Sequence, residues 1–240
     1  MKTQLIEKNL IRLGSAYGGW TILGDGSLNK GTVISAGLGE DASFDVEMIN
    51  KYDCSVLAVD PTPRSSLHFD EIKKSFGANK INDYTEGGKQ PISAYNLSKV
   101  NIENYQLLRF GLSDSNGQAK FYRPSSPGFV SHSLESNQNS SANDYFKIEV
   151  ICIRKLLEKF GKRISLLKLD IEGSEFRVLK SLSSNDLLPY QICVEFDFIR
   201  SETKKTKRDF HSLVEHLRNL NYEFIFEDGL NYTLVHRDIL

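Results

Sequence analysis

The sequence predicts an α/β fold with a doubly wound, mostly parallel sheet whose last strand is antiparallel. Three observations predict it. Short apolar runs alternate with segments whose apolar residues recur at helical spacing. The run Gly31–Ala36 ends in the turn Gly37-Leu38-Gly39, which is typical of the first crossover of an open α/β sheet. Two strand-like segments flank Asp228-Gly229-Leu230-Asn231 near the end, and this pattern favours an antiparallel hairpin.

Length and composition indicate an ordinary globular protein. The chain has 240 residues, of which 40% are hydrophobic and 25% are charged, and this size suits one large α/β domain. We divide it into a lead-in helix and flap over residues 1–30 and a main domain over residues 31–240, with an insertion at about 118–150. The net charge of −1 gives no indication of a nucleic-acid partner.

The sequence gives no indication of a membrane span, a signal segment, disulfide bonds or a metal site. No apolar run approaches the roughly 20 residues needed to cross a membrane, so we expect no membrane insertion. The first residues lack an apolar signal core, which leads us to expect a cytoplasmic protein. Cys54, Cys152 and Cys193 are scattered among apolar residues, which favours free thiols. No Cys/His cluster has metal-ligand spacing, and we expect no metal site.

We expect three β/α units in the amino-terminal half, after the lead-in. We expect a helix over Leu5–Leu13 and a small strand or flap over 18–23. The central strands are Gly31–Ala36, Ser55–Val59 and Tyr105–Phe110. A helix containing Phe44, Met48 and Ile49 follows the first strand, with Asp41 as its N-cap. A helix containing Leu67, Ile72 and Phe76 follows the second, whereas residues 77–104 predict no regular element.

An insertion interrupts the alternation after the third strand. Residues 120–122 and 146–150 have strand character and predict a hairpin. The polar segment 124–144 between them is too long to be a mere connector, and such loops in compact domains are usually functional or disordered.

The carboxyl-terminal half is easier to assign. Ile153, Leu156, Leu157 and Phe160 follow helical spacing, and Gly161 is expected to end that helix. The nearly continuous apolar run 164–170 predicts a strand covered on both faces. The remaining elements are a helix around 176–182, a strand over 191–198, an amphipathic helix over 210–220, and the hairpin 222–227 with 232–236.

The first turn suggests a nucleotide ligand, and two cofactors compete for it. The run from Gly37 to Ala42 satisfies the dinucleotide fingerprint in its Ala-ending form, and Asp60 follows where a ribose-binding acid belongs. An NAD-dependent oxidoreductase is therefore a candidate. A pyrophosphate would, however, meet Glu40 and Asp41 at the helix N-terminus, where anions normally bind. S-adenosylmethionine carries an ammonium and a sulfonium instead of phosphates, so the acidic turn favours it. A glycine turn without any ligand remains an alternative.

Four segments together resemble the FkbM family of S-adenosylmethionine-dependent methyltransferases. They are Ile34–Asp45, Val59–Arg64, Gly111–Asp114 and Leu167–Glu175, the last containing Asp-x-Glu-Gly-x-Glu. The resemblance runs from about Trp20 to Phe198. It implies a Rossmann-like class I methyltransferase fold with a seven-stranded sheet, and typically O-methylation of a hydroxyl on a sugar, polysaccharide or secondary metabolite. The chain departs from the broader class I pattern at Ser35, where an acid is usual, and at Asp41, where a glycine is usual.

Position along the chain then assigns the residues that would bind the donor. Gly37, Gly39, Glu40 and Asp41 are expected along its methionine part, and Asp60 at its ribose. Ser113 and Asp114 lie where the adenine edge is commonly recognised, although Asp114 also fits a plain turn.

The candidate catalytic residues are Asp170, Glu172 and His132. Methyl transfer aligns an acceptor oxygen with the methyl group and removes a proton, and a carboxylate at the end of a strand suits both tasks. Glu172 also fits a helix-capping role, and His132 in the inserted loop also fits a solvated side chain. Glu195 is a candidate for substrate binding, because acids inside a central strand are costly to bury without partners. A non-catalytic member of the same fold remains an alternative.

Overall fold

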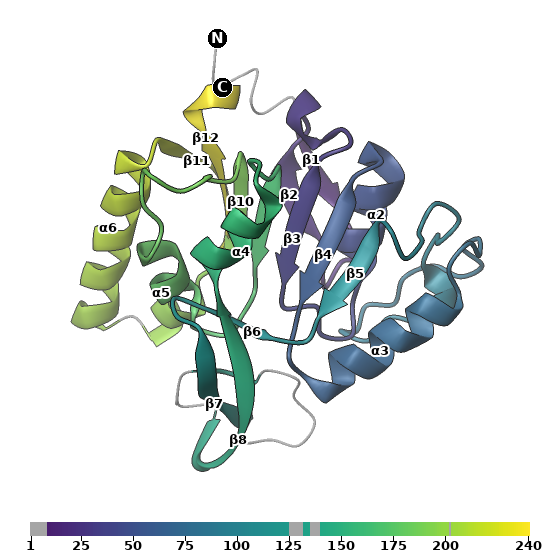
Figure 1. The fold of residues 1–240 in the computed structure, drawn as a ribbon, viewed down its shortest axis with the longest axis horizontal. Coiled ribbons are helices and arrows are strands. Elements are labelled where there is room, and N and C mark those ends of the chain that lie inside the picture. The colour runs from purple at the N-terminus through teal and green to yellow at the C-terminus, as the bar shows by residue number, and fades with distance from the viewer. Residues whose placement is uncertain (1–8, 125–131, 135–139, 202) are drawn as a thin grey trace.

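The structure is a computed structural model that describes residues 9–124, 132–134, 140–201 and 203–240. Its centre is a seven-stranded sheet in the order β11-β12-β10-β9-β3-β4-β5, with helices on both faces (Figure 1). The strands are β3 (Thr32–Ala36), β4 (Ser55–Val59), β5 (Tyr105–Leu108), β9 (Leu166–Leu169), β10 (Gln191–Glu195), β11 (Tyr222–Asp228) and β12 (Asn231–His236). The predicted fold class is confirmed.

Strand direction follows the prediction as well. The strands from β5 through β4, β3 and β9 to β10 pair in parallel. The last strand, β12, pairs antiparallel with both β10 and β11. Because β3 and β9 are neighbours in the middle of the sheet, the loops that follow them emerge side by side at one edge, where ligands of open α/β sheets bind.

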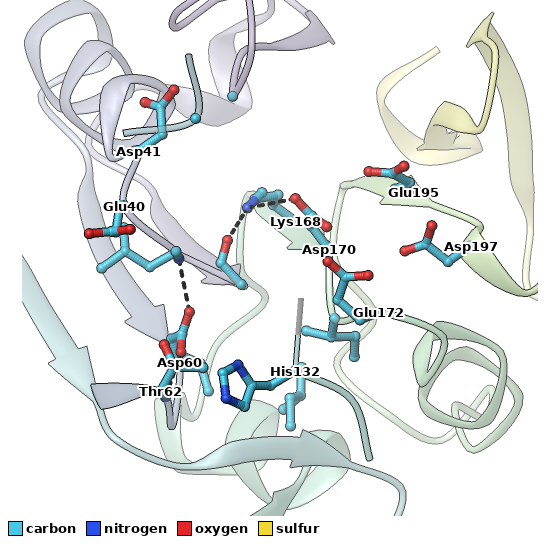
Figure 2. A pocket seen from close by; sticks show the side chains of 18 of the residues that line it. Glu40, Asp41, Asp60, Thr62, His132, Lys168, Asp170, Glu172, Glu195 and Asp197 are labelled. Atoms are coloured by element: carbon cyan, nitrogen blue, oxygen red, sulfur yellow. Dashed lines mark hydrogen bonds and ion pairs between the residues drawn. The ribbon is translucent and has the colours of Figure 1, made fainter. Parts of the chain in front are cut away.

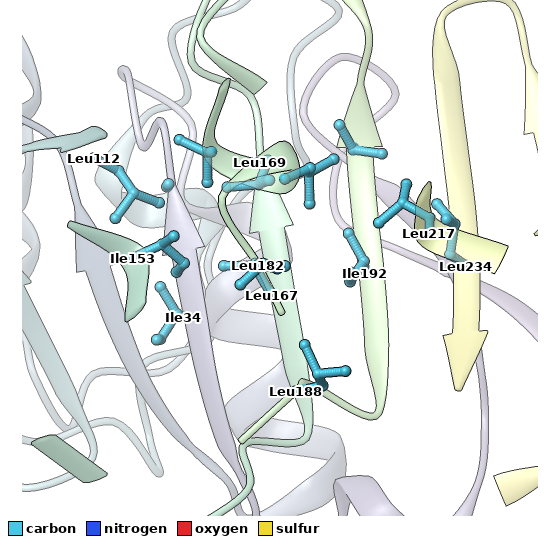
Figure 3. Packing of buried hydrophobic residues seen from close by; sticks show 14 of the residues in the cluster. Ile34, Leu112, Ile153, Leu167, Leu169, Leu182, Leu188, Ile192, Leu217 and Leu234 are labelled. Atoms are coloured by element: carbon cyan, nitrogen blue, oxygen red, sulfur yellow. The ribbon is translucent and has the colours of Figure 1, made fainter. Parts of the chain in front are cut away.

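Each face of the sheet has its own apolar core. The helices α2 (Ser43–Tyr52) and α3 (Pro63–Lys74) cover one face, and α4 (Ile153–Phe160), α5 (Glu175–Lys180) and α6 (Lys204–Asn219) cover the other. Ile34 of β3 and Leu167 of β9 pack with the second group of helices (Figure 3), whereas their neighbours Val33 and Leu166 face the first. The alternation reflects the two-residue period of a strand covered on both sides.

The predicted helix over Leu5–Leu13 is wrong in its described part. Residues 1–8 lie outside the described residues, and Leu10–Leu13 form strand β1, which pairs antiparallel with β2 (Trp20–Leu23). Local spacing favoured a helix, but hairpin pairing with the buried strand β2 decides the structure. The small extra strand expected at residues 18–23 is present as β2.

The inserted hairpin is confirmed, and it is larger than predicted. β7 (Gly117–Pro124) and β8 (Ser140–Cys152) pair antiparallel, with Phe121 opposite Phe146. A third strand, β6 (Gly111–Ser113), adds in parallel to β8. The hairpin projects from one end of the central sheet (Figure 1). Most of the polar loop predicted over 124–144 lies outside the described residues.

Two further features of the described residues concern the cysteines and the apolar character of the helices. Cys54, Cys152 and Cys193 are all free thiols, as predicted. Among the helices that the structure describes, none combines the length and apolar character needed to cross a bilayer.

Candidate functional site

A cavity of about 640 Å³ opens at the carboxyl ends of the central strands. Its size lies within the usual range of about 300–1,000 Å³ for small-molecule sites. Segments from both halves of the chain line it, including the turn after β3, the end of β4, the loops after β9 and β10, and the hairpin β7–β8. Figure 2 shows Glu40 and Asp41 on one side of this cavity and Glu195 and Asp197 on the other.

The turn after β3 is tied to the end of β4 through Asp60. The Gly39 amide donates to Asp60 Oδ2 at 2.9 Å, and the Thr62 amide donates to Asp60 Oδ1 at 2.7 Å. Gly39 has φ +57°, and a Cβ placed on it would have no atom within 4 Å. The turn therefore presents open space at Gly39, beside a buried carboxylate that is fixed in orientation.

Glu40 is buried and already paired with two cations. Its carboxylate accepts from Arg64 at 2.5 Å and from Lys89 at 3.1 Å. The charge of Glu40 is therefore balanced by Arg64 and Lys89, so that the acidic character predicted for this turn rests on Asp41.

Asp41 anchors the amino-terminal hairpin that walls the cavity. Its Oδ2 accepts from the Ser15 hydroxyl at 2.5 Å and its Oδ1 accepts from the Ser43 amide at 2.9 Å. The N-cap of α2 is Ala42, so the predicted N-cap, Asp41, was wrong by one residue. Tyr17 and Trp20, on either side of Gly18-Gly19, line the cavity. The lead-in segment is thus part of the site.

The loop after β9 carries Asp170 and Glu172 into the cavity. Glu172 has φ +56° and Gly173 has φ +102°, which turns the chain sharply after Asp170. The buried Glu175 holds this loop, since its carboxylate accepts from the amides of Ile171 and Gly173, each at 2.9 Å. In the motif Asp-x-Glu-Gly-x-Glu, the first two acids therefore face the cavity, and the third shapes the loop.

The end of β10 supplies a second acidic wall. The predicted strand over 191–198 ends at Glu195, and a 3₁₀ helix over Asp197–Ser201 follows. Arg200 donates to Asp197 at 2.7 Å and to Glu195 at 3.3 Å. Burial, followed by repulsion from Asp170, Asp197 and Glu172, raises the pKa of Glu195 to about 7. Burial also raises the pKa of Asp170, and Lys168 opposes this shift.

The inserted hairpin reaches the cavity through His132. The His132 ring stacks on Phe121 with centroids 5.5 Å apart, and both residues line the cavity. The neighbouring Ser133 hydroxyl donates to the Glu172 carbonyl at 2.5 Å, and Ser133 also pairs with Tyr122 of β7. The insertion is thereby fastened to the loop that carries Glu172.

Two predicted donor-binding residues are not brought to the cavity. Ser113 is buried in β6 and donates to Asp114 at 3.0 Å, and Asp114 is exposed. Their neighbours Gly111 and Leu112 line the cavity instead. Of the candidate residues named from the sequence, the cavity brings together Gly37, Gly39, Glu40, Asp41, Asp60, His132, Asp170, Glu172 and Glu195.

Asp170, Glu172 and Asp197 form a group that the sequence did not suggest. One carboxylate oxygen from each lies within 4.8 Å of the others, which is geometry that a divalent cation can use. Two of these acids already face cations of the chain, because Arg200 contacts Asp197 and the Lys168 ammonium lies 3.8 Å from Asp170 Oδ2.

A family model gives the decisive comparison. The model of the methyltransferase FkbM domain matches residues 29–224. The chain belongs to the FkbM methyltransferase family. This match confirms the resemblance seen in the sequence motifs. No curated protein matches the chain.

Two matches among solved structures have low identity and low TM-scores and serve for comparison only. The fibrillarin pre-rRNA processing protein of Methanococcus jannaschii shares 10% identity with this FkbM methyltransferase domain at a TM-score of 0.41, over 87% of this chain and 68% of that one. The cyclopropane synthase MmaA2 of Mycobacterium tuberculosis shares 9% identity at a TM-score of 0.38, over 95% of this chain and 62% of that one.

Several residues that line the site of this FkbM methyltransferase were missed by sequence reasoning. Lys168 stands inside an apolar run that predicted only a buried strand, although a lysine in such a run is itself a signal. Arg200 and Asp197 follow a strand that was predicted to continue through residue 198. Tyr17 and Trp20 belong to a lead-in that was not connected with the site.

Proposed function

We propose that this chain is an S-adenosylmethionine-dependent O-methyltransferase that acts on a hydroxyl of a small molecule or glycan, such as a sugar, polysaccharide or secondary metabolite. One observation carries the proposal: within a methyltransferase domain, a single cavity joins the Gly37–Gly39 turn and Asp60 to the carboxylates of Asp170, Glu172 and Glu195. The glycine turn and Asp60 fit a nucleoside donor, and the three carboxylates fit an acceptor hydroxyl that gives up its proton.

The residues present fit the donor. Open space at Gly39 allows close approach of a ligand to the backbone. The Asp60 carboxylate accepts from two amides and keeps further lone pairs for the hydroxyls of a ribose. Asp170 lines the cavity next to Gly37, where its negative charge would suit a sulfonium. Glu40 is paired with Arg64 and Lys89, and the Lys168 ammonium lies 3.8 Å from Asp170 Oδ2. The preference for a sulfonium therefore rests on Asp41 and on the part of the Asp170 charge that Lys168 does not balance.

The donor, when bound, supplies a methyl group activated by its sulfonium. The chain itself then has to orient the acceptor hydroxyl and take its proton. Asp170 and Glu172 lie together at one end of the cavity and would orient the hydroxyl. Glu195, with a pKa of about 7, would accept a proton near neutral pH. His132 lies on the aromatic side of the cavity, where it would contact the acceptor.

Calorimetric titration with S-adenosylhomocysteine tests donor binding. We expect saturable heat with the wild-type protein and a loss of at least about tenfold in affinity for Asp60→Asn. Asp70→Asn serves as the matched control, because Asp70 makes an exposed ion pair with Arg109 and neither residue lines the cavity. No heat with the wild type, or saturable binding of NADH monitored by fluorescence, would contradict the proposal.

The acceptor is sought with a donor that carries an isotopically labelled methyl group. We expect label to enter a hydroxyl-bearing fraction of cell extracts or glycans, and to be lost with Asp170→Ala. Donor binding of unchanged affinity in Asp170→Ala, together with no transfer by the wild type to any acceptor pool, would favour the non-catalytic alternative.

A further inference from the structure

Lys168 is a buried ammonium at the centre of the sheet. It lies on β9 between Leu167 and Leu169, which both pack against the helices α4–α6. Lys168 therefore faces the opposite side, where Leu166 is part of the other core, and it is only 6% exposed. Burial of a charge is costly unless partners compensate for it, so the contacts of this side chain need an explanation.

The strands next to Lys168 do not supply a counter-charge. In the sheet register its Cα partners are Ser35 on β3 and Cys193 on β10, and both side chains are neutral. Burial raises the pKa of the Cys193 thiol to about 12, which keeps it protonated. The ammonium finds its partners instead at the edge of the sheet, where the cavity begins.

Three segments that are far apart in the sequence meet at the Lys168 ammonium. Nζ donates to the Gly37 carbonyl at 2.5 Å and lies 3.8 Å from Asp170 Oδ2. It also lies 5.7 Å from the centroid of the Trp20 ring. Figure 2 shows Lys168 beside Asp170, with a dashed line between the two side chains. Lys168 thus connects the turn assigned to the donor, the loop assigned to the acceptor, and the amino-terminal hairpin.

Building on the proposed function, we propose that Lys168 is a positioning residue that joins the donor turn to the acceptor loop and balances the charge of Asp170 where the sulfonium of the donor lies. The contact with Gly37 fixes the turn. The contact with Asp170 fixes the carboxylate and reduces the negative charge that a bound sulfonium meets. Lys168 therefore acts on the donor through Gly37 and Asp170.

The two effects are separated by comparing two ligands. S-adenosylmethionine carries the sulfonium charge, and S-adenosylhomocysteine lacks it. Loosening the turn lowers the affinity for both ligands equally, whereas exposing the charge of Asp170 raises the affinity for the charged ligand alone. The ratio of the two affinities therefore reports the electrostatic role, and a purely structural role leaves that ratio unchanged.

The test is calorimetry with both ligands on the wild type, Lys168→Met, Lys168→Arg, Asp170→Asn and the double variant Lys168→Met/Asp170→Asn. Lys168→Met should lower the affinity for S-adenosylhomocysteine by about tenfold and shift the affinity ratio toward S-adenosylmethionine by several-fold. Lys168→Arg keeps the charge and should preserve the ratio. In the Asp170→Asn background, Lys168→Met should no longer shift the ratio, because the carboxylate through which it acts is gone.

The outcomes distinguish the two proposals. Failure of the wild type to bind either ligand overturns the proposed function. Binding by the wild type, with a ratio unchanged in Lys168→Met or shifted equally in both Asp170 backgrounds, overturns the role of Lys168 alone. Lys168→Gln replaces Lys168→Met in the same cycle should the methionine variant not fold.

Discussion

The carbonyl oxygen of Asp170 lies so close to Gly37 that a Cβ added to Gly37 would stand 1.7 Å from it. Gly37 also has φ +83°, a conformation that other residues rarely adopt. The glycine therefore does more than allow a tight turn. Because it has no side chain, the loop after β9 can pack directly against the turn after β3, which brings the two halves of the cavity together.

Gly37→Ala is expected to destabilise the fold severely. The added Cβ would collide with the Asp170 backbone, which has no flexible end that can move away, and we expect a loss of about 4 kcal/mol or more in the free energy of unfolding. Gly39→Ala is the matched control, since its Cβ meets open space and only the strain of its φ of +57° remains, worth about 1–2 kcal/mol. Urea unfolding measures both. Equal losses in the two variants would contradict this account.

Glu175→Ala is expected to loosen the loop that carries Asp170 and Glu172. The substitution leaves the partly buried amides of Ile171 and Gly173 without their acceptor, at a cost of about 2–5 kcal/mol for the two together. Glu175→Gln keeps one carbonyl oxygen in the same place and should cost less than about 2 kcal/mol. The measurements are urea unfolding and the affinity for S-adenosylhomocysteine. A glutamine variant as damaged as the alanine variant would show that charge, rather than hydrogen bonding, holds the loop.

The sequence predicted the parts of the fold that leave a local periodic signal. The run around Leu166–Leu169 is apolar because both faces of β9 are covered, and α4 follows helical spacing because only one of its faces is buried. By contrast, β1 forms through pairing with β2, and β6 through pairing with β8. Pairing with a partner strand, whether nearby as for β1 or distant as for β6, need not leave a periodic pattern in the segment itself, and β1 was assigned to a helix.

The sequence pointed to the acidic residues of the candidate site but not to its cationic residues. Asp60 and Asp170 stand at the ends of predicted strands, where the topology of an open sheet places ligand-binding groups. Glu195 was predicted inside a strand that in the structure ends at this residue. Lys168 and Arg200 balance those acids, but which acid each would meet depends on the sheet order and on the turn after β10. A sequence shows that charges are present, whereas their pairing is set only by the fold.

Removal of divalent cations is expected to leave donor binding unchanged. Asp197 is paired with Arg200 at 2.7 Å, and the Lys168 ammonium lies near Asp170, so two acids of the group Asp170, Glu172 and Asp197 already have a counter-charge. The affinity for S-adenosylhomocysteine should therefore agree within about twofold with and without EDTA. A saturable heat on titration with Mg²⁺ that disappears in Asp197→Asn would show instead that the group binds a metal.

Glu195→Gln is expected to stabilise the protein above neutral pH and to have little effect in acid. The pKa of Glu195 is raised from 4.5 to about 7 in the fold, so the folded state holds this proton more tightly than the unfolded state does. The wild type therefore loses stability as the pH rises from about 4.5 to about 7, where the partly buried carboxylate ionises. Glutamine stays neutral and avoids that loss, which we put at about 1–3 kcal/mol for a side chain that is partly exposed.

Urea midpoints of the Glu195→Gln variant and the wild type at about pH 5 and about pH 8 measure the difference. Glu103→Gln, on an exposed turn before β5, is the matched control. A difference between Glu195→Gln and the wild type that is the same at both pH values would mean that Glu195 is ionised in the fold throughout, and it would remove the reason to regard this residue as the proton acceptor.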